Sequence, residues 1–361
     1  MDKIDVVHFV TGGFSGATAV ARQLVQQANQ SAGEQHLLVL RKKRQTRVAQ
    51  LQQLTDQQIP YLVVPGWSHL ATILSLMNLL KRLKPRVLIA HGFSEHLWGR
   101  LAAVIAGVPV IIHVEHNSKE RYTPMRLWLA KKLAVRTRWL VGVSEGVKNS
   151  LLAYGFPAEK CVFVNNGIDL LPYKNALDLS WSSRIPGIVM CARFARQKDH
   201  ATLLHALALL KDNYQLTPPL ILIGGGKASL RRRNEQLAQE LGVHNQVQFL
   251  GYVNDVPSLL KKYTISVLST HYEGFGLVLA EAMAAGCFVI GSAVPGVQEW
   301  LAAVDEHFIV PAADAIALAD RIAWVLQNPA IAEPVAQRGH LAACDSFGLR
   351  RMYEEYKQLI S

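Results

Sequence analysis

The sequence predicts an α/β protein with two Rossmann-like, doubly wound domains that face a central cleft. Short apolar segments alternate with segments of helical periodicity along most of the chain. This alternation is typical of parallel sheets covered by helices on both faces. The segments form two series, separated by a stretch at 170–186 with two prolines and few apolar repeats. A chain of 361 residues is long enough for two domains, each with its own core.

The first series predicts an N-terminal domain over residues 1–170. After the first strand, a turn with Gly12, Gly13 and Gly16 opens a helical segment, so flexible backbone can approach a phosphate or an acceptor sugar there. The turn lacks the full G-x-G-x-x-G spacing and Glu34 is a poor acidic partner, so it is weak support for dinucleotide binding. Strands are predicted at Ile4–Val10, Leu37–Leu40, Tyr61–Val64, Val87–Ala90, Val110–Val114, Leu140–Val143 and Cys161–Val164.

The second series predicts a C-terminal domain over residues 171–347. The glycine run at 224–226 follows one of its strands, either as a ligand-binding loop or as a tight strand-to-helix turn. A last helical segment lies at 348–361. Strands are predicted at Ile188–Cys191, Leu220–Ile223, Val247–Phe249, Ile265–Leu268, Phe288–Gly291 and Phe308–Val310.

Two carboxylates lie eight residues apart in the segment Glu273-Gly-Phe-Gly-Leu-Val-Leu-Ala-Glu281. Eight helical residues rise about 12 Å, too far for two carboxyl groups that share one proton but suitable for one long ligand. A nucleotide-sugar is such a ligand, with sugar hydroxyls at one acid and ribose hydroxyls at the other. Gly274 and Gly276 would open the helix and leave N–H groups free for a diphosphate. The alternative is a glycine turn and a helix with an exposed glutamate.

Two cations, Arg193 and Lys198, follow the predicted strand at Ile188–Cys191. Fixed cations at the end of a strand suit a leaving diphosphate, which gains negative charge as the bond breaks. Taken alone, the same residues are also compatible with a solvated surface loop.

In their order and spacing, these and other short motifs resemble the retaining GT-B glycosyltransferases of the large family that includes many bacterial lipopolysaccharide, capsule and mannoside synthases. The resemblance extends over nearly the whole chain. The motifs are Thr11-Gly-Gly-Phe-Ser-Gly16, Ile89-Ala-His91, Glu115-His-Asn117, Val143-Ser-Glu145, Asn166-Gly-Ile-Asp169, Arg193…Lys198, Ile223-Gly-Gly-Gly226, Phe249-Leu-Gly251, Glu273-Gly-Phe-Gly276…Glu281 and Pro295-Gly-Val-Gln-Glu299.

The resemblance implies a retaining hexosyltransferase that uses a nucleotide-sugar, with a UDP-sugar favoured and GDP-mannose as the other candidate. It also implies that the segment 348–361 packs back on the first domain. The implied catalytic residues are His116, Arg193, Lys198 and Glu273. The implied donor-binding residues are Gly13, Gly16, Val253, Phe275, Gly276, Leu277 and Glu281. A nucleotide-sugar epimerase of the same fold is the alternative function.

The resemblance implies that His116, after the strand at Val110–Val114, lies beside the donor sugar near its anomeric carbon. There it could donate a hydrogen bond to a sugar hydroxyl, or stabilise the cationic sugar through its backbone carbonyl. A structural histidine at a strand end is the alternative. His91 ends the preceding strand and is assigned to the acceptor side. No D-x-D pattern occurs, so we expect no metal and no other cofactor.

The excess positive charge lies entirely in the first half of the chain. Residues 1–170 hold 21 Lys and Arg against 10 Asp and Glu, whereas residues 171–361 hold 17 of each. The clusters are Arg41–Arg44 with Arg47, Lys81–Arg86, and the stretch 119–138, which also contains Trp128 and is followed by Trp139. We interpret the last as a basic amphipathic helix for an anionic membrane, with an ordinary surface helix as the alternative.

The remaining features predict a cytoplasmic protein that can lie on the inner face of the membrane. No nucleic-acid-binding module accompanies the basic clusters, so nucleic acid is not an expected partner. The expected partners are the nucleotide-sugar, a glycan or lipid-linked acceptor and the anionic membrane. No apolar segment approaches the roughly 20 residues that span a bilayer, and no signal-peptide pattern is visible. The cysteines, Cys161, Cys191, Cys287 and Cys344, show no C-x-x-C spacing and indicate reduced thiols.

Overall fold

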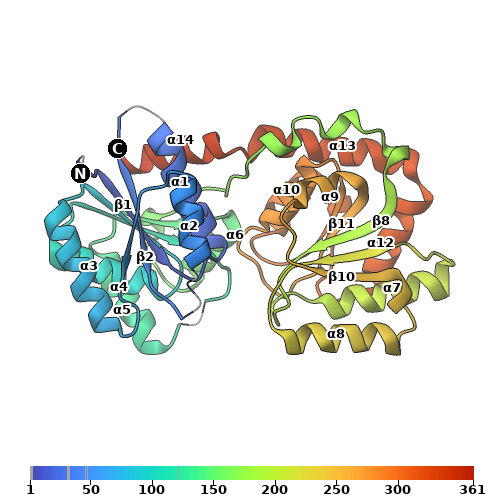
Figure 1. Cartoon of the computed structure of the whole chain (residues 1–361), viewed down its shortest axis with the longest axis horizontal. Coiled ribbons are helices and arrows are strands. Elements are labelled where there is room, and N and C mark those ends of the chain that lie inside the picture. Colours follow the sequence, from blue (N-terminus) through green and yellow to red (C-terminus); the bar gives the residue numbers. More distant parts are fainter. Residues whose placement is uncertain (1–2, 31–32, 45, 47, 121) are drawn as a thin grey trace. The chain divides into compact units, whose positions relative to one another are not determined.

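The computed structural model describes residues 3–30, 33–44, 46, 48–120 and 122–361. It divides into two compact units. Unit 1 comprises Met1–Gly167 and Leu349–Ser361, and unit 2 comprises Ile168–Gly348. Each unit has a parallel sheet with helices on both faces (Figure 1), which confirms the predicted fold class.

Within the described ranges, the sheet of unit 1 has the strand order β3-β2-β1-β4-β5-β6-β7. Its strands are β1 (Val6–Thr11), β2 (His36–Arg41), β3 (Tyr61–Val64), β4 (Val87–His91), β5 (Val110–Glu115), β6 (Trp139–Gly142) and β7 (Cys161–Phe163). Its helices are α1 (Gly16–Gln30), α2 (Val48–Asp56), α3 (His69–Leu83), α4 (Glu95–Ala106), α5 (Pro124–Ala134), α6 (Glu145–Ala153) and α14 (Leu349–Ile360).

The core of unit 1 lies on both faces of this sheet because successive strand residues point to opposite sides. Val7 and Phe9 of β1 pack in one cluster with apolar residues of α3 and α4. Val10 packs in a second cluster with apolar residues of α1 and α2. His8 shares the second face with Val10, so a polar ring lies within a buried layer.

Within unit 2 the strand order is β10-β9-β8-β11-β12-β13. The strands are β8 (Ile185–Cys191), β9 (Leu220–Ile223), β10 (Val247–Gly251), β11 (Tyr263–Leu268), β12 (Phe288–Ser292) and β13 (Ile309–Val310). The helices are α7 (His200–Tyr214), α8 (Ala228–Glu240), α9 (Val256–Lys262), α10 (Leu277–Ala284), α11 (Gln298–Val304), α12 (Ala315–Gln327) and α13 (Pro329–Ser346).

The segments that join the units differ in detail from the sequence-based expectation. The stretch 170–186 forms three short 3-10 turns and then enters β8, which begins at Ile185 rather than Ile188. The chain returns to unit 1 through α14, where the Met352 sulfur accepts a hydrogen bond from Gly167 N–H at 3.1 Å. Tyr353 of the same helix contacts the ring of His36 edge-on.

No helix within the described ranges combines the length and apolar character needed to cross a membrane.

Candidate functional site

Two loops of unit 2 meet at the carboxyl ends of the neighbouring strands β8 and β11. The backbone N–H of Asp199 donates to the Ser269 carbonyl at 3.1 Å. Lys198 and Thr270 form an antiparallel bridge one residue further along. Ligands of open parallel sheets bind beyond these strand ends, so the pairing holds Lys198 where such a ligand would lie.

The side chains of Lys198 and Glu273 form an ion pair at this edge. Both are largely buried, and a second oxygen of Glu273 accepts from Gly274 N–H at 3.1 Å. The structure therefore brings together two of the predicted charges. The Lys198 charge is compensated in the empty protein and can be shared with an anionic ligand.

Helix α10 begins at the same edge, directly after Gly276. This glycine has φ +78°, a left-handed conformation that suits glycine, and no side chain caps the helix. The N–H groups of Leu277 and Val278 donate to no other group in the described part of the chain. Unpaired amides at a helix start attract anions.

Glu281 lies one helical turn and a half further along α10. Part of its side chain is exposed, yet burial raises the pKa of its carboxyl to about 7. No described residue pairs with this carboxylate, and burial alone accounts for its raised pKa. The negative charge of Glu281 also contributes to raising the pKa of Cys191, which places Glu281 near the end of β8.

Arg193 also follows β8, but its side chain is exposed and has no partner among the described residues. The backbone beside it is fixed, because Phe194 N–H donates to Gly225 O at 2.7 Å. A Cβ at Gly224 would lie 2.2 Å from the Ala192 carbonyl oxygen. Close approach of two backbones accounts for Gly224, and also for Gly226, where a Cβ would lie 2.6 Å from the Phe194 carbonyl oxygen. This supports the tight-turn interpretation.

Phe275, predicted as a donor-binding residue, has its side chain in the core of unit 2. The side chain is 2% exposed, and its ring stacks on Trp300 with centroids 5.0 Å apart. The indole N–H of Trp300 donates to the Phe275 carbonyl at 3.0 Å. Phe347 packs edge-on against both rings. Phe275 therefore anchors the loop before α10 and does not present a ring to a ligand.

The other end of this loop is supported by the motif Pro295-Gly-Val-Gln-Glu299. A Cβ at Gly296 would lie 2.5 Å from the Gly274 carbonyl oxygen and 2.6 Å from that of Glu273. Gly296 has φ +92°, and its N–H donates to the Glu299 carboxylate at 2.8 Å. This motif therefore acts as a support under Glu273.

Val253 follows β10, at the outer edge of the sheet, and is half-buried. The loop that carries Val253 begins at Gly251, whose carbonyl accepts from Gly224 N–H at 2.7 Å. This hydrogen bond connects the loop to the glycine run beside Arg193. Tyr252, beside Val253, is exposed. The donor-binding role of Val253 stays a prediction.

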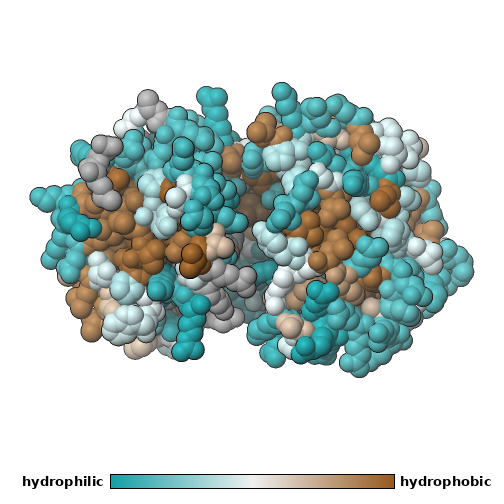
Figure 2. Space-filling view, in the orientation of Figure 1, coloured by the Kyte–Doolittle hydropathy of each residue, from teal (hydrophilic) through white to brown (hydrophobic). Residues whose placement is uncertain are grey.

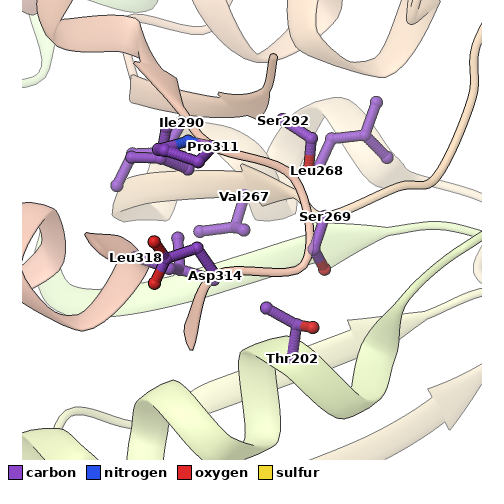
Figure 3. Close-up of a pocket in the computed structure, with 10 residues that line it drawn as sticks. Thr202, Val267, Leu268, Ser269, Ile290, Ser292, Pro311, Asp314 and Leu318 are labelled. Carbon is purple, nitrogen blue, oxygen red and sulfur yellow. The ribbon is translucent and has the colours of Figure 1, made fainter. Parts of the chain in front are cut away.

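A small pocket lies beneath the site loops (Figure 3). Its polar lining includes Ser269 after β11 and Ser292 at the end of β12. Ser269 donates to the Asp199 carbonyl at 2.7 Å, and Ser292 accepts from Thr270 N–H at 3.0 Å. The pocket has no room for a water molecule. Both serines thus hold the two loops that meet at Lys198 and Thr270.

In unit 1, His116 and His91 lie together at the carboxyl ends of β5 and β4. Nε2 of His116 is 3.2 Å from Nδ1 of His91. A Cβ at Gly92 would be in van der Waals contact with both His116 and Ala17, the residue after Gly16. The predicted histidines and the glycine turn at the start of α1 therefore converge within unit 1. Gly13 lies in the same turn, where its N–H donates to Thr11 Oγ1 at 3.3 Å.

A second histidine cluster was not identified from the sequence. His96, His113 and Glu115 place ligand-type atoms within 4.8 Å of one another. His96 has both ring nitrogens engaged, Nδ1 with the fully buried Arg100 at 2.9 Å and Nε2 with the Tyr122 hydroxyl at 3.2 Å. A buried guanidinium already supplies positive charge here, so the cluster suits a polar core better than a second cation.

Arg41, at the start of the first basic cluster, takes part in a buried polar network of unit 1. It is buried and donates to Ser94 Oγ at 3.0 Å, and its Nη2 is 2.9 Å from His69 Nδ1. Lys43 and Arg41 both contact the Glu95 carboxylate. Ser94 has φ +74°, a strained value for a non-glycine residue. This cluster lies at the carboxyl ends of β2 and β4 and is a further candidate for the acceptor side.

The basic stretch 119–138 is not one amphipathic helix. Only Pro124–Ala134 is helical, and Trp139 lies in β6. Residue 121 lies outside the described residues. The exposed side of α5 mixes Met125 (76% exposed) and Trp128 (59% exposed) with Lys131 and Lys132. Cations and large apolar side chains therefore share one surface.

A second exposed apolar group lies at the start of α3, where Trp67 is 84% exposed and Leu70 is 65% exposed. Figure 2 shows apolar side chains gathered on the surface of unit 1 in this view. Such side chains are a common feature of membrane-contacting surfaces.

Two family models match the chain. Residues 14–170 match Glycosyltransferase Family 4, and residues 181–341 match Glycosyl transferases group 1.

Curated relatives are similar over part of their length. The chain is 28% identical over 176 residues to the lipopolysaccharide core biosynthesis glycosyltransferase LpsE of Rhizobium meliloti, over 49% of this chain and 50% of that protein. It is 25% identical over 241 residues to an Escherichia coli UDP-Gal:alpha-D-GlcNAc-diphosphoundecaprenol alpha-1,3-galactosyltransferase, over 62% of each. The matches span about half the length of the first relatives.

Among solved structures, Anabaena HepE in complex with UDP superposes with a TM-score of 0.83 at 19% identity, over 98% of this chain and 99% of that one. This likeness shows a shared fold.

Proposed function

Since its two halves belong to the family 4 and group 1 glycosyltransferases, we propose that this GT-B chain is a retaining glycosyltransferase. It moves a hexose from a nucleotide-sugar to a glycan or lipid-linked glycan. The name of the Escherichia coli relative supports a UDP-sugar as donor. The names of that relative and of LpsE support a role in lipopolysaccharide or polysaccharide synthesis.

The observation that carries the proposal is the unpaired Glu281 carboxylate on the helix whose first amides are also unpaired. A buried carboxylate that has no hydrogen-bond partner is strongly stabilised by a ligand that donates two hydroxyl hydrogen bonds to it. The ribose of a nucleotide offers such a pair. The amides of Leu277 and Val278 then face the diphosphate from the start of the same helix.

Lys198, Arg193 and Glu273 of unit 2 bind the diphosphate and the sugar during cleavage of the bond between them. Lys198 turns from Glu273 toward the diphosphate, and Arg193, which has no competing partner, adds a second cation. Glu273, once released, accepts hydrogen bonds from sugar hydroxyls. Together with the α10 amides, these cations stabilise the charge of the leaving group without a metal.

Retention follows from attack on the face from which the diphosphate leaves. The bond between the anomeric carbon and the diphosphate oxygen breaks while the sugar gains oxocarbenium character near His116. The acceptor oxygen bonds to the same face of the anomeric carbon, and its proton passes to a diphosphate oxygen. No protein nucleophile takes part in this scheme.

The mixed surface of unit 1 suits an acceptor carried by a membrane. Trp128 and Met125 can enter the interfacial region while Lys131 and Lys132 contact anionic headgroups. We place the protein in the cytoplasm, on the inner face of the membrane, where nucleotide-sugars and lipid-linked glycans meet.

The proposal is tested by thermal stabilisation in EDTA with UDP, GDP, ADP and their common sugar conjugates. One nucleotide series should raise the Tm of the wild type, because a ligand at 100 times its Kd contributes about 2.7 kcal/mol. Glu281→Ala should weaken that ligand about 10- to 100-fold, since two hydrogen bonds to a charged group are lost. Glu240→Ala, at a carboxylate on α8, is the matched control.

Stabilisation by none of the nucleotides, or equal stabilisation of Glu281→Ala and wild type, would contradict the donor site. Conversion of UDP-N-acetylglucosamine with no acceptor present would instead support an epimerase. The anomeric configuration of the transferred sugar, read by NMR, tests retention.

A further inference from the structure

A row of four buried or half-buried histidines crosses one face of the sheet in unit 1. His36 begins β2, His8 lies in β1, His91 ends β4 and His116 follows β5. These strands are consecutive neighbours in the sheet. The parallel register places each histidine two residues further along than the one before it. The row therefore runs diagonally, from the amino end of β2 to the carboxyl end of β5.

Each ring in the row is hydrogen bonded to the next, with the same pairing of nitrogens every time. His116 Nε2 lies 3.2 Å from His91 Nδ1, and His91 Nε2 lies 3.1 Å from His8 Nδ1. His8 Nε2 lies 3.0 Å from His36 Nδ1. Each link needs one N–H and one lone pair, so a neutral row has only two consistent arrangements of protons.

The two arrangements differ in whether His36, at the β2 end of the row, carries its proton on Nε2 or on Nδ1. The residue beside His36 Nε2 favours one of them. His36 Nε2 lies 3.6 Å from a carboxylate oxygen of Glu34, and the other Glu34 oxygen forms an ion pair with Arg86. A carboxylate in an ion pair with a guanidinium can only accept hydrogen bonds. A carboxylate facing a bare imidazole nitrogen would set lone pairs against each other. At 3.6 Å the two atoms are too far apart for a hydrogen bond, but attraction between the carboxylate and an N–H favours the proton on His36 Nε2. Every ring behind it then has the same tautomer.

An added proton on the row is disfavoured. Burial lowers the pKa of His36 to about 4 and that of His116 to about 3, and it also lowers the pKa of His8 and His91. The rings are therefore neutral near pH 7. Asp5 and Arg86 are the other charges that act on His36.

We propose that Glu34 acts through His36, His8 and His91 to hold His116 as the Nε2–H tautomer. Nδ1 of His116 is then a bare hydrogen-bond acceptor. It has no partner among the described residues. The group that binds there must bring its own proton, as a sugar hydroxyl does. Glu34 and the three inner histidines are positioning residues, since they act on a ligand only through His116.

The catalytic consequence rests on the proposed function. If His116 lies beside the donor sugar, its side chain accepts from a sugar hydroxyl, and it does not donate to one. A neutral acceptor also stabilises positive charge on the sugar better than an imidazolium would. The side chain is excluded as the acid that protonates the leaving group.

The test is the tautomer state of the row, read from the imidazole ¹⁵N resonances of the full chain near pH 7. We expect all four histidines as neutral Nε2–H rings in the wild type. Glu34→Gln removes the charge but keeps the shape, and its amide can donate or accept. It should therefore populate the reversed tautomers, because a charged acceptor is favoured over a neutral one by about fivefold.

The matched control is Glu159→Gln, an exposed carboxylate of the same unit outside the row. It should leave every tautomer unchanged. For sugar transfer, Glu34→Gln should lower kcat by about twofold, because about half of the molecules keep the Nε2–H arrangement, and should leave KM for the nucleotide-sugar unchanged. An Nδ1–H ring in the wild-type row, or identical tautomers in Glu34→Gln and wild type, would overturn the proposal. Because the tautomers are read without substrate, a protein that transfers no sugar still gives a decisive result.

Discussion

The ionised carboxylate of Glu281 destabilises the ligand-free protein, whereas in the proposed complex it binds the ribose hydroxyls. Its carboxyl is desolvated, has no described partner and has a pKa of about 7 against an ordinary value of 4.5. Below pH 4.5 the group is protonated in both the folded and the unfolded state, so it has no effect on stability. As pH rises from 4.5 to 7, the unfolded state ionises first and the folded state loses relative stability.

Glu281→Gln should therefore stabilise the ligand-free protein at pH 8. We expect a gain of about 1–3 kcal/mol in the free energy of unfolding, below the full value for the pKa shift because the side chain is partly exposed. The gain should vanish as pH falls toward 4.5. Urea unfolding at pH 8 and pH 5 measures it, with Glu240→Gln as control. A variant less stable than the wild type at pH 8 would show that Glu281 already has a stabilising partner.

At the scale of the elements, the site is an assembly of loops held by close backbone contacts. Gly296 is the clearest support, because its position beneath Glu273 leaves no room for a side chain. Gly225 lies in another loop of the same sheet edge, where a Cβ would meet nothing within 4 Å. These two glycines provide a matched pair of substitutions.

Gly296→Ala should lower the free energy of unfolding by about 1–3 kcal/mol, because alanine adds both a clash and strain at positive φ. It should also weaken nucleotide-sugar binding at least about tenfold by moving Glu273, which holds the sugar hydroxyls. Gly225→Ala should change both quantities little. Titration calorimetry with the stabilising nucleotide-sugar, alongside urea unfolding, checks the pair. Unaltered binding by Gly296→Ala would refute the supporting role of the motif Pro295–Glu299.

The strands were predictable because buried parallel strands are nearly continuous apolar runs, as in Val87–Ala90 and Ile265–Leu268. The sequence also indicated that Lys198 lies at a strand end. It could not show that Lys198 pairs with Glu273, because this pairing depends on β8 and β11 being neighbours. The histidine row depends on the register of four strands and had no signal in the sequence.

Individual side chains were harder to predict where their burial depends on distant segments. Phe275 is covered by Trp300 and Phe347, which lie 25 and 72 residues further along the chain. Arg41 is buried by contacts with His69 and Ser94. An aromatic residue in a glycine loop, or an arginine in a basic run, has the same local sequence whether it is exposed or covered.

At the scale of the whole molecule, charge and exposed apolar area both favour unit 1 as the membrane-contacting part. The positive excess lies within residues 1–170. Trp67 and Trp128 are exposed on the same unit, and tryptophan favours the membrane interface.

Binding to vesicles should therefore require anionic lipid and weaken as salt is raised. Trp128→Ala should reduce this binding about tenfold, the effect of losing one large interfacial side chain. Co-sedimentation with anionic and zwitterionic vesicles measures it. Ile331→Ala, at an exposed apolar residue of unit 2, should bind like the wild type. Equal binding to both vesicle types would contradict an electrostatic contribution from unit 1.

Helix α14 also sets an order of events during synthesis. Met352, Tyr353, Tyr356 and Ile360 are buried in unit 1, yet the ribosome adds them only after the whole of Ile168–Gly348. At roughly 5–20 residues per second, this delay is on the order of 10–40 s. The unit that is translated first is therefore the one completed last. During that interval the surface of unit 1 that α14 covers, including part of α1, is exposed, and it is a natural place for a chaperone to bind the nascent chain.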